Sequence, residues 1–304
     1  MENISYSFTR YLEAKKTVDD RALHRPTWDA LRRELADRRP IAPLRLLEVG
    51  AGIGTMLQRM VEWQLLSSAS YTAIDLEPQN LLLARQRLAT WGHLADAPPH
   101  STLLKKENAL ISLEMEAIDI SEFARRNAGQ RAWDLLVAHA VLDLLDLPST
   151  LPQLFSLLTS GGLFYFTINF DGLTLLEPAL DPDLDERIMH LYHQTMDNRA
   201  LHGVPSGDSR TGRHLFTRLQ QSGAQVLQAG ASDWVVFPQQ GRYPADEAYF
   251  LHFIIHTIQS ALSGHPELDA MQFAQWNARR HTQVERGELV YIAHQIDFFG
   301  KYPG

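Results

Sequence analysis

The stretch LLEVGAGIGTML, residues 46–57, constrains the fold more than any other part of the sequence. An apolar run with one acid, Glu48, leads into three glycines at alternate positions, Gly50, Gly52 and Gly54. Glycine admits backbone angles that other residues avoid and lets other groups approach the backbone closely. A strand that feeds a glycine turn and then a helix is typical of the first βα turn of a doubly wound sheet, where ligands bind at the carboxyl ends of the strands. We therefore expect an α/β fold with a ligand at this turn.

Short apolar segments alternate with helical segments from residue 41 onward, which favours βαβ units and a parallel sheet. The predicted strands cover residues 44–49, 71–74, part of 111–118, 133–139, 162–170, and two later segments near 224–230 and 288–296. The expected fold class is α/β, with a doubly wound, mostly parallel seven-stranded sheet and helices on both faces.

The segments outside this alternation are rich in helical patterns. At the N-terminus, Trp28, Leu31 and Leu35 share one face of a predicted helix. We expect these additions to form a lid over the carboxyl ends of the strands. The predicted boundaries are an N-terminal helical cap at 1–40, one main domain at 41–304, and lid insertions within it at 171–213 and 243–284.

Composition excludes several classes of partner and site. The chain has 28 Lys plus Arg against 36 Asp plus Glu, a formal charge of -8, and no basic run, so a nucleic-acid partner is not expected. The absence of cysteine excludes disulfides and thiolate chemistry. The first residues are polar and lack an apolar signal core, and no stretch is apolar enough to span a membrane. We expect a cytoplasmic protein with no membrane partner, either a monomer or a homodimer.

Two common phosphate-binding loops do not fit the glycine stretch. A dinucleotide loop requires G-x-G-x-x-G, and Thr55 stands where its third glycine would fall. The G-x-x-x-x-G-K-[ST] loop is also absent. Glu48 would repel a pyrophosphate at the helix N-terminus, but it suits a ligand that carries an ammonium group.

The run E-V-G-A-G-I-G, residues 48–54, resembles motif I of the class I S-adenosylmethionine-dependent methyltransferases. In that family an acid after the second strand accepts hydrogen bonds from both ribose hydroxyls, and Asp75 in AIDLEP stands there. An acid in the loop after the third strand meets the adenine amino group, and Asp119 in EAIDIS fits that position. Ile120 or Leu76 can then pack against the adenine ring.

The resemblance extends through the D-L-L-V pattern at 134–137 and covers residues 44 to about 170. It implies S-adenosyl-L-methionine as cofactor, S-adenosyl-L-homocysteine as product, and no metal. It also implies a set of cofactor-binding residues: Glu48, Gly50, Ala51, Gly52, Gly54, Asp75, Leu76, Asp119, Ile120 and His139.

Simpler structural roles remain open for these residues. The glycines can form a tight turn without a ligand, and Asp75 can cap the N-terminus of the following helix. Asp119 can be a solvated acid, and Glu48 can be a buried acid bonded to loop amides.

Three residues are candidates for catalysis or acceptor contact. His139, at the end of the fourth strand, could remove a proton from the acceptor, which is worth about 10²- to 10⁴-fold in rate. The alternative role for His139 is to line the methionine pocket. Asn169 and Asp171 follow the fifth strand, where either could touch the acceptor or simply form a turn.

Other polar segments are weaker candidates. Arg210 and Arg213 could meet a carboxylate on the acceptor, and the polar N-terminal segment 10–25 could also contribute. We expect Asp143 to be a helix residue rather than a catalyst, and the aromatic-rich segment 252–263 to belong to the core.

The function expected from these features is methyl transfer to an O or N atom of a small-molecule acceptor by in-line displacement. Two alternatives remain: a non-catalytic S-adenosylmethionine-binding module, and a nicotinamide-dependent oxidoreductase.

Overall fold

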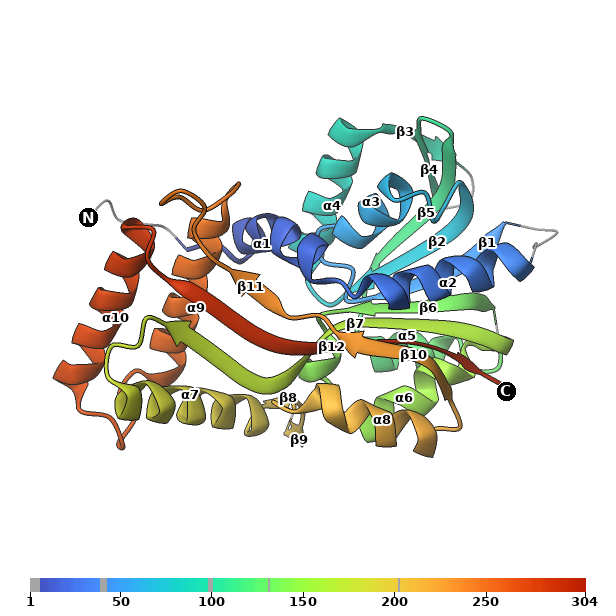
Figure 1. The fold of residues 1–304 in the computed structure, drawn as a ribbon. Coiled ribbons are helices and arrows are strands. Elements are labelled where there is room, and N and C mark those ends of the chain that lie inside the picture. Colours follow the sequence, from blue (N-terminus) through green and yellow to red (C-terminus); the bar gives the residue numbers. More distant parts are fainter. Residues whose placement is uncertain (1–5, 39–42, 98–100, 131, 202) are drawn as a thin grey trace.

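A computed structural model describes residues 6–38, 43–97, 101–130, 132–201 and 203–304 of the chain (Figure 1). The helices are α1 (Phe8–Ala22), α2 (Arg25–Arg38), α3 (Thr55–Glu62), α4 (Pro78–Trp91), α5 (Ile120–Arg126), η1 (Leu142–Leu144, a 3-10 turn), α6 (Leu147–Ser156), α7 (Pro182–Asp197), α8 (Thr211–Gln221), α9 (Glu247–Leu262) and α10 (Ala270–Glu285). The strands are β1 (Leu44–Val49), β2 (Ser68–Asp75), β3 (His93–Ala97), β4 (Ser101–Lys106), β5 (Ala109–Ala117), β6 (Trp133–His139), β7 (Leu158–Glu177), β8 (Ala200–Leu201), β9 (Val204–Pro205), β10 (Gln225–Ala231), β11 (Trp234–Val236) and β12 (Val290–Tyr302).

One ten-stranded sheet organises the molecule, in the order β10-β12-β7-β6-β1-β2-β5-β4-β3, with β11 paired to β12. The five central strands, β5, β2, β1, β6 and β7, are parallel, and β12 runs antiparallel to β7. Strand order reverses on either side of β1, as in a doubly wound sheet. The predicted α/β fold class is therefore confirmed, although the sheet has ten strands instead of seven.

The strands that the sequence did not reveal lie at the margins of the sheet. The β3–β4 hairpin adds to one edge through β5, and the short β11 adds beside β12. Residues of β3 are mostly exposed or half-buried, so this strand lacks the apolar alternation that marks a buried one. In addition, β7 continues to Glu177, beyond the predicted end at residue 170, because β12 pairs with it that far.

Helices cover both faces of the parallel strands, and the side chains of each strand alternate between them. Leu46 packs in a core with α2, α3 and α4, whereas its neighbour Leu47 packs in a core with α5, α6 and α8. This is the period of two expected for a strand that is buried on both faces. Figure 1 shows α2, α3 and α4 above the sheet, and α6 and α8 below it.

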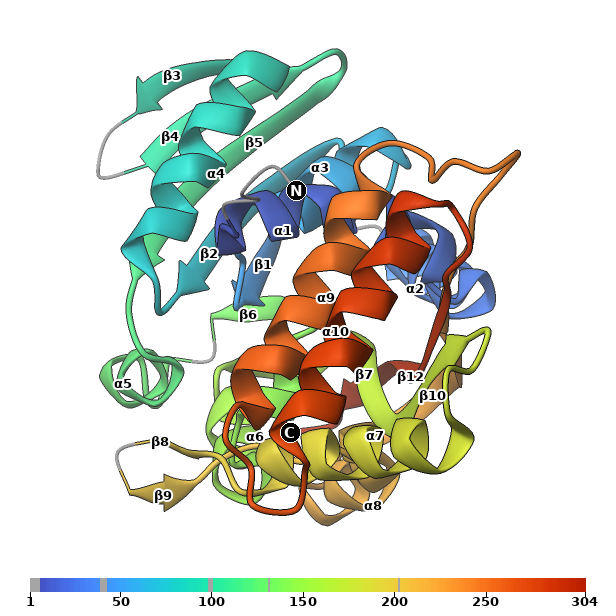
Figure 2. The same ribbon diagram turned by 90° about the vertical axis from the view of Figure 1, so that its left-hand side faces the viewer.

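A third apolar core lies beyond the carboxyl ends of the parallel strands. The C-terminal part of β7 and the N-terminal part of β12, together with β11, extend past the other strands of the sheet and pack against α1, α7, α9 and α10 (Figures 1 and 2). Phe250, Ile255 and Ile258 of α9 are fully buried there, so the aromatic-rich helix does belong to a core. Among the described residues, no helix combines the length and the apolar character that crossing a membrane would require.

Candidate functional site

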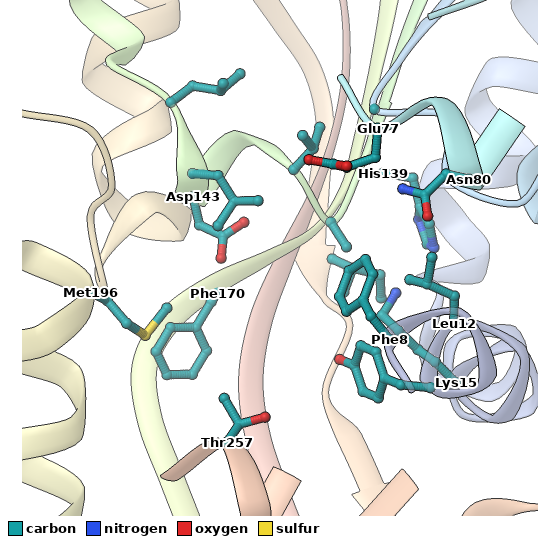
Figure 3. A pocket seen from close by; sticks show the side chains of 18 of the residues that line it. Phe8, Leu12, Lys15, Glu77, Asn80, His139, Asp143, Phe170, Met196 and Thr257 are labelled. Carbon is teal, nitrogen blue, oxygen red and sulfur yellow. The ribbon is translucent and has the colours of Figure 1, made fainter. Parts of the chain in front are cut away.

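A cavity of about 620 Å³ lies at the carboxyl ends of the parallel strands. Its lining comes from the loops after β1, β2, β5 and β6, and from α1, η1, α7, α9, β11 and β12. The volume is within the range of about 300–1,000 Å³ that is usual for small-molecule sites. In Figure 3, Glu77, Asn80 and His139 lie on one side of this space, and Asp143, Phe170 and Met196 lie on the other.

The three glycines of the motif are required for different reasons. All three have left-handed backbone angles, with φ of +66° at Gly50, +54° at Gly52 and +76° at Gly54. A Cβ on Gly50 would lie 2.6 Å from Cγ2 of Val141, so the loop after β6 needs this glycine. A Cβ on Gly52 would meet nothing nearer than Leu12 at 3.7 Å.

Gly50 and Gly52 line the cavity together with Ala51, whereas Gly54 does not line it. A Cβ on Gly54 would lie 3.4 Å from Cβ of Ala84 in α4, so this glycine allows helix packing. Gly52 is thus the position where the glycine loop opens towards a ligand.

Asp75 ends β2 and holds the glycine loop in place. Its Oδ2 accepts a hydrogen bond from the Gly52 amide at 2.7 Å, and its Oδ1 accepts from the Glu77 amide at 2.9 Å and from Asn80 Nδ2 at 3.1 Å. A carboxylate offers about four lone-pair sites, so Oδ2 can accept one further hydrogen bond. The adjacent Glu77 also lines the cavity.

Glu48 is 1% exposed and lines the cavity beneath the glycine loop. Burial raises the pKa of Glu48 to about 8, although a 2.6 Å hydrogen bond from the Tyr71 hydroxyl and the charge of Arg59 oppose the shift. Burial without a cation in contact favours the protonated acid. A ligand ammonium placed beside Glu48 would favour its ionised form.

The residues predicted to meet the adenine ring lie at the cavity as well. Asp119 is the N-cap of α5, and its Oδ1 accepts from the amides of Ser121 at 2.8 Å and Glu122 at 3.1 Å. Ile120 and the exposed Leu76 line the same part of the cavity. The capping role and the lining role of Asp119 therefore coexist.

His139 lines the cavity at the end of β6, with both ring nitrogens engaged by the protein. Nε2 lies 3.0 Å from Asp19 Oδ2, and Nδ1 lies 2.8 Å from Thr167 Oγ1. Burial lowers the pKa of His139 to about 4, against the opposing charge of Asp19, so the neutral imidazole prevails at neutral pH. An ionised carboxylate only accepts, so Nε2 carries the proton and Nδ1 accepts from the threonine hydroxyl.

The hydrogen-bond partner of His139 Nε2 is Asp19 of α1. The sequence indicated the polar segment 10–25 but not this residue. Asp19 is 2% exposed; its Oδ2 accepts from Lys15 Nζ at 2.6 Å and its Oδ1 accepts from Trp234 Nε1 at 2.9 Å. Burial disfavours the charge of Asp19, but Lys15 and His139 outweigh it and hold its pKa below the usual range.

The spacing of residues in α1 could have predicted which face of this helix lines the cavity. One face of this helix lines the cavity: Phe8, Leu12, Lys15 and Asp19. These positions are three or four residues apart, as on one side of an α-helix. The sequence of this segment is polar, which suggests a solvent-exposed helix. Lys15 and Asp19 are nevertheless buried, because they form an ion pair with each other.

Asn169 and Asp171 do not line the cavity, although their neighbours Ile168 and Phe170 do. Asn169 Nδ2 donates to the Ile296 carbonyl at 2.8 Å. Asp171 Oδ1 accepts from the Arg213 amide at 2.7 Å and from Arg213 Nε at 2.8 Å. Alternate residues of a strand point to opposite faces, which explains why these two turn away; Arg213 is likewise committed to Asp171.

Several cavity residues were not assigned to the site from the sequence. Asp143, which was expected to be a helix residue, lies in the 3-10 turn η1 and lines the cavity, as do Arg199, after α7, and several aromatic side chains. Burial raises the pKa of Asp143. The aromatic residues come from five different elements or loops: Tyr11, Phe170, Tyr192, Trp234 and Tyr291.

Comparison with known proteins finds a family model that matches part of this chain. Residues 47–164 match a family model described as a methyltransferase domain. No curated protein matches the sequence significantly. Similar solved structures include the YjhP protein of E. coli (15% identity, 95% of this chain and 98% of that chain covered, TM-score 0.47), the YcgJ protein of Bacillus subtilis (11%, 91% and 99%, 0.46) and a mycolic acid cyclopropane synthase in complex with S-adenosylhomocysteine and CTAB (12%, 90% and 83%, 0.45).

The matched segment begins within β1 and ends within β7, so it contains the glycine loop and the ends of β2, β5 and β6. The segment is similar to a methyltransferase domain, which agrees with the resemblance of its glycine motif to the class I S-adenosylmethionine-dependent methyltransferases. Helices α1, α2 and the elements that follow β7 lie outside this segment.

S-adenosylmethionine is the cofactor of this class, and the cavity residues fit it. Gly52 leaves open space beside the loop, Asp75 keeps one acceptor site, and Glu48 offers a carboxyl group. Within the described part of the chain, no group of three or more His, Asp or Glu residues is placed to hold a metal ion. That no metal is needed stays a prediction.

Proposed function

We propose that this chain transfers a methyl group from S-adenosylmethionine to an O or N atom of a small-molecule acceptor. The observation that carries the proposal is the shape of the cavity, which runs from the glycine loop to a second region lined by α1, α7 and α9. When bound, the cofactor would supply an activated methyl group, whose carbon bonds to the acceptor atom in line as S-adenosylhomocysteine is displaced. The protein then contributes alignment and exclusion of water, and good alignment alone can be worth several kcal/mol.

The proposed cofactor contacts follow the lining of the glycine side of the cavity. Asp75 Oδ2 accepts from one ribose hydroxyl, and Glu77 is placed for the other. Glu48 lies near the ligand ammonium, and Ile120 and Leu76 lie beside the adenine ring.

We propose a positioning role for His139 in place of general-base catalysis. Its Nδ1 accepts from Thr167 and its Nε2 donates to Asp19, so no ring lone pair is available for an acceptor proton. The imidazole instead fixes the end of β6 against α1 and lines the cavity where the cofactor meets the acceptor.

We further propose that the helical additions form the lid, as their boundaries at 1–40, 171–213 and 243–284 suggested. Phe8, Tyr11 and Leu12 of α1, Met196 of α7 and Thr257 of α9 all line the cavity. An enclosure of this kind favours a small acceptor over a protein or a nucleic-acid strand, because only a small molecule fits within about 620 Å³ beside the cofactor.

Asp75→Ala tests the ribose contact separately from the folding of the loop. We expect S-adenosylhomocysteine to bind at least tenfold more weakly to the variant, a loss of about 1.4 kcal/mol. A 2′,3′-dideoxy analogue should bind the wild-type protein weakly and lose little further affinity on substitution, because the hydroxyl contact is already missing. Equal losses for both ligands would show that Asp75 only holds the loop.

The reaction itself is tested with methyl-labelled S-adenosylmethionine and a mixed metabolite extract. The proposal expects label in one or a few small molecules, detected by mass spectrometry, and less label with Asp75→Ala at a limiting concentration of S-adenosylmethionine. Binding of S-adenosylhomocysteine without any labelled product would favour the non-catalytic binding module. Failure of that ligand to bind, with NADH binding instead, would favour the oxidoreductase.

A further inference from the structure

The region of the cavity away from the glycine loop has an unusual combination of side chains. It is lined by aromatic rings, among them Phe170 and Tyr192, and by the carboxyl group of Asp143. Figure 3 shows the Asp143 carboxyl group directed into the space between Phe170 and the side that carries His139. This region of the cavity therefore combines aromatic rings with an acid.

Among the described residues, Asp143 forms no ion pair. Among the residues that the structure describes, no Lys, Arg or His nitrogen lies within 4.0 Å of its carboxylate. Lys15 faces the same space, but its ammonium is bound to Asp19 at 2.6 Å. Arg199 also faces Asp143, from an exposed position at the edge of the cavity.

The Asp143 side chain is half-buried and lines the cavity, and a partly desolvated carboxylate that lacks an ionic partner among the described residues is costly to the protein. The pKa of Asp143 is raised, mainly by burial, whereas a hydrogen bond from its own backbone amide and the charges of Arg199 and Lys15 act in the opposite direction. A cation that entered the cavity would supply the missing partner and recover part of that cost. The site therefore favours a positively charged group over a neutral group of the same shape.

The aromatic rings around Asp143 strengthen this preference. The Tyr11 ring is held by α9, since it stacks on Phe253 at a centroid distance of 4.4 Å and an interplanar angle of 18°. The Phe170 ring is held edge-on by His193 at 5.2 Å. Ring faces attract ammonium groups, by about 2 kcal/mol or more where water is excluded. Fixed rings beside a carboxylate form a binding site for an amine.

We infer that the methyl acceptor is a small amine, whose nitrogen is held by the Asp143 carboxylate among Tyr11, Phe170 and Tyr192. This inference rests on the proposed function and narrows its O-or-N alternative to N-methylation. An acceptor with a second, anionic group could place that group towards Arg199 at the cavity edge.

The chemistry balances with Asp143 as the proton acceptor. An amine that enters as R–NH3⁺ gives one proton to the Asp143 carboxylate, which leaves R–NH2 with a free lone pair. The nitrogen lone pair forms the N–C bond with the methyl group, and the sulfur keeps the electron pair of the S–C bond that breaks. The product is a methylated ammonium ion. The raised pKa of Asp143 makes its carboxylate a better proton acceptor than an exposed aspartate.

Matched probes separate charge from shape. The protein is saturated with S-adenosylhomocysteine, and the affinities of n-butylammonium, n-butanol and butanoate are measured by calorimetry, together with phenethylammonium, 2-phenylethanol and 3-phenylpropanoate. We expect each ammonium probe to bind at least tenfold more tightly than its alcohol, about 1.4 kcal/mol, and each carboxylate to bind most weakly. A preference for alcohol or carboxylate, or no ammonium binding at millimolar concentration, overturns the inference.

Two variants assign the preference to Asp143. Asp143→Asn keeps the shape of the side chain and should remove the ammonium preference, whereas Asp143→Glu should retain part of it. Asp146→Asn is the control, because it removes a nearby charge that does not line the cavity, and its preference should equal that of the wild-type protein. An ammonium preference that persists in Asp143→Asn overturns the assignment.

S-adenosylhomocysteine affinity distinguishes this inference from the proposed function. If that ligand binds and the ammonium preference is absent, only the amine inference fails. If that ligand does not bind to the folded protein, the proposed function itself fails. Asp143→Asn should keep the S-adenosylhomocysteine affinity of the wild-type protein, which also shows that the variant is folded.

Discussion

At the scale of single residues, the glycine motif combines three separate requirements. Gly50 makes room for Val141, Gly54 makes room for α4, and Gly52 opens onto the cavity. The sequence alone shows three equivalent glycines. Their division of roles depends on which elements pack against each one, so it appears only in the folded chain.

Gly50→Ala should lower the free energy of unfolding much more than Gly161→Ala. Both glycines have positive φ, +66° and +71°, so both substitutions carry a left-handed strain of about 1–2 kcal/mol. Only at Gly50 does the new Cβ meet a neighbour, Val141 at 2.6 Å, whereas nothing lies within 4 Å at Gly161. Urea unfolding of both variants measures the difference, and equal losses of stability would contradict the packing argument.

Glu48 should make the stability of the protein depend on pH. Its pKa is about 8 in the folded chain, against 4.5 as the ordinary value. Between these values the folded state keeps a proton that the unfolded state releases, so stability falls as pH rises through this window. Glu48→Gln removes this titration. The free energy of unfolding of the variant, relative to that of the wild-type protein, should therefore increase as pH rises.

Urea titrations at pH values on either side of the window test this prediction. Tyr71→Phe is a useful companion, because it removes the hydrogen bond that favours ionised Glu48 and should extend the fall in stability to higher pH. A stability difference between wild type and Glu48→Gln that stays constant with pH would show that Glu48 is ionised in the fold.

At the scale of elements, the local sequence predicted the strands that are buried on both faces. Strands β1 and β6 were placed at their observed bounds, since apolar residues fill both of their faces. Strand β3 was missed because its side chains are mostly exposed or half-buried. The extension of β7 was missed because β12, more than a hundred residues later, stabilises it by pairing.

In the candidate site, too, the sequence predicted only the residues that belong to a local motif. Residues of the glycine loop and Asp75 were identified because a local motif carries them. Asp19, Asp143 and the aromatic lining were not, because they reach the cavity only when α1, η1 and α7 pack together. Asn169 was proposed from its position at a strand end, but the strand register directs it to the opposite face.

The docking of α1 depends on the buried pair between Lys15 and Asp19. Asp19→Ala would leave the Lys15 ammonium, the Trp234 N–H and the His139 N–H without their acceptor. Breaking a buried ion pair in this way costs about 3–5 kcal/mol. Urea unfolding should show a loss of that order.

Glu34→Ala is the matched control for that measurement. Glu34 pairs with Arg38 at the same i,i+4 spacing, but both side chains are about one-third exposed, at 36% and 32%. An exposed pair contributes about 0–1 kcal/mol. Similar small losses for both variants would mean that α1 does not depend on the buried pair.

At the scale of the whole molecule, the chain joins a matched methyltransferase domain to helices that lie outside it. The domain supplies the glycine loop and the ends of β2, β5 and β6, while α1, α7 and α9 supply the remaining cavity wall. Cofactor and lid would then stabilise each other, because a ligand in the cavity touches both. Ligand binding to the folded state raises apparent stability by mass action.

The most direct test of the account is isothermal titration of the folded, full-length protein with S-adenosylhomocysteine. The account predicts a saturable heat with one site per chain and a matching rise in thermal stability, and neither effect with NADH. The absence of any heat with S-adenosylhomocysteine, or tighter binding of NADH at the same cavity, would contradict it.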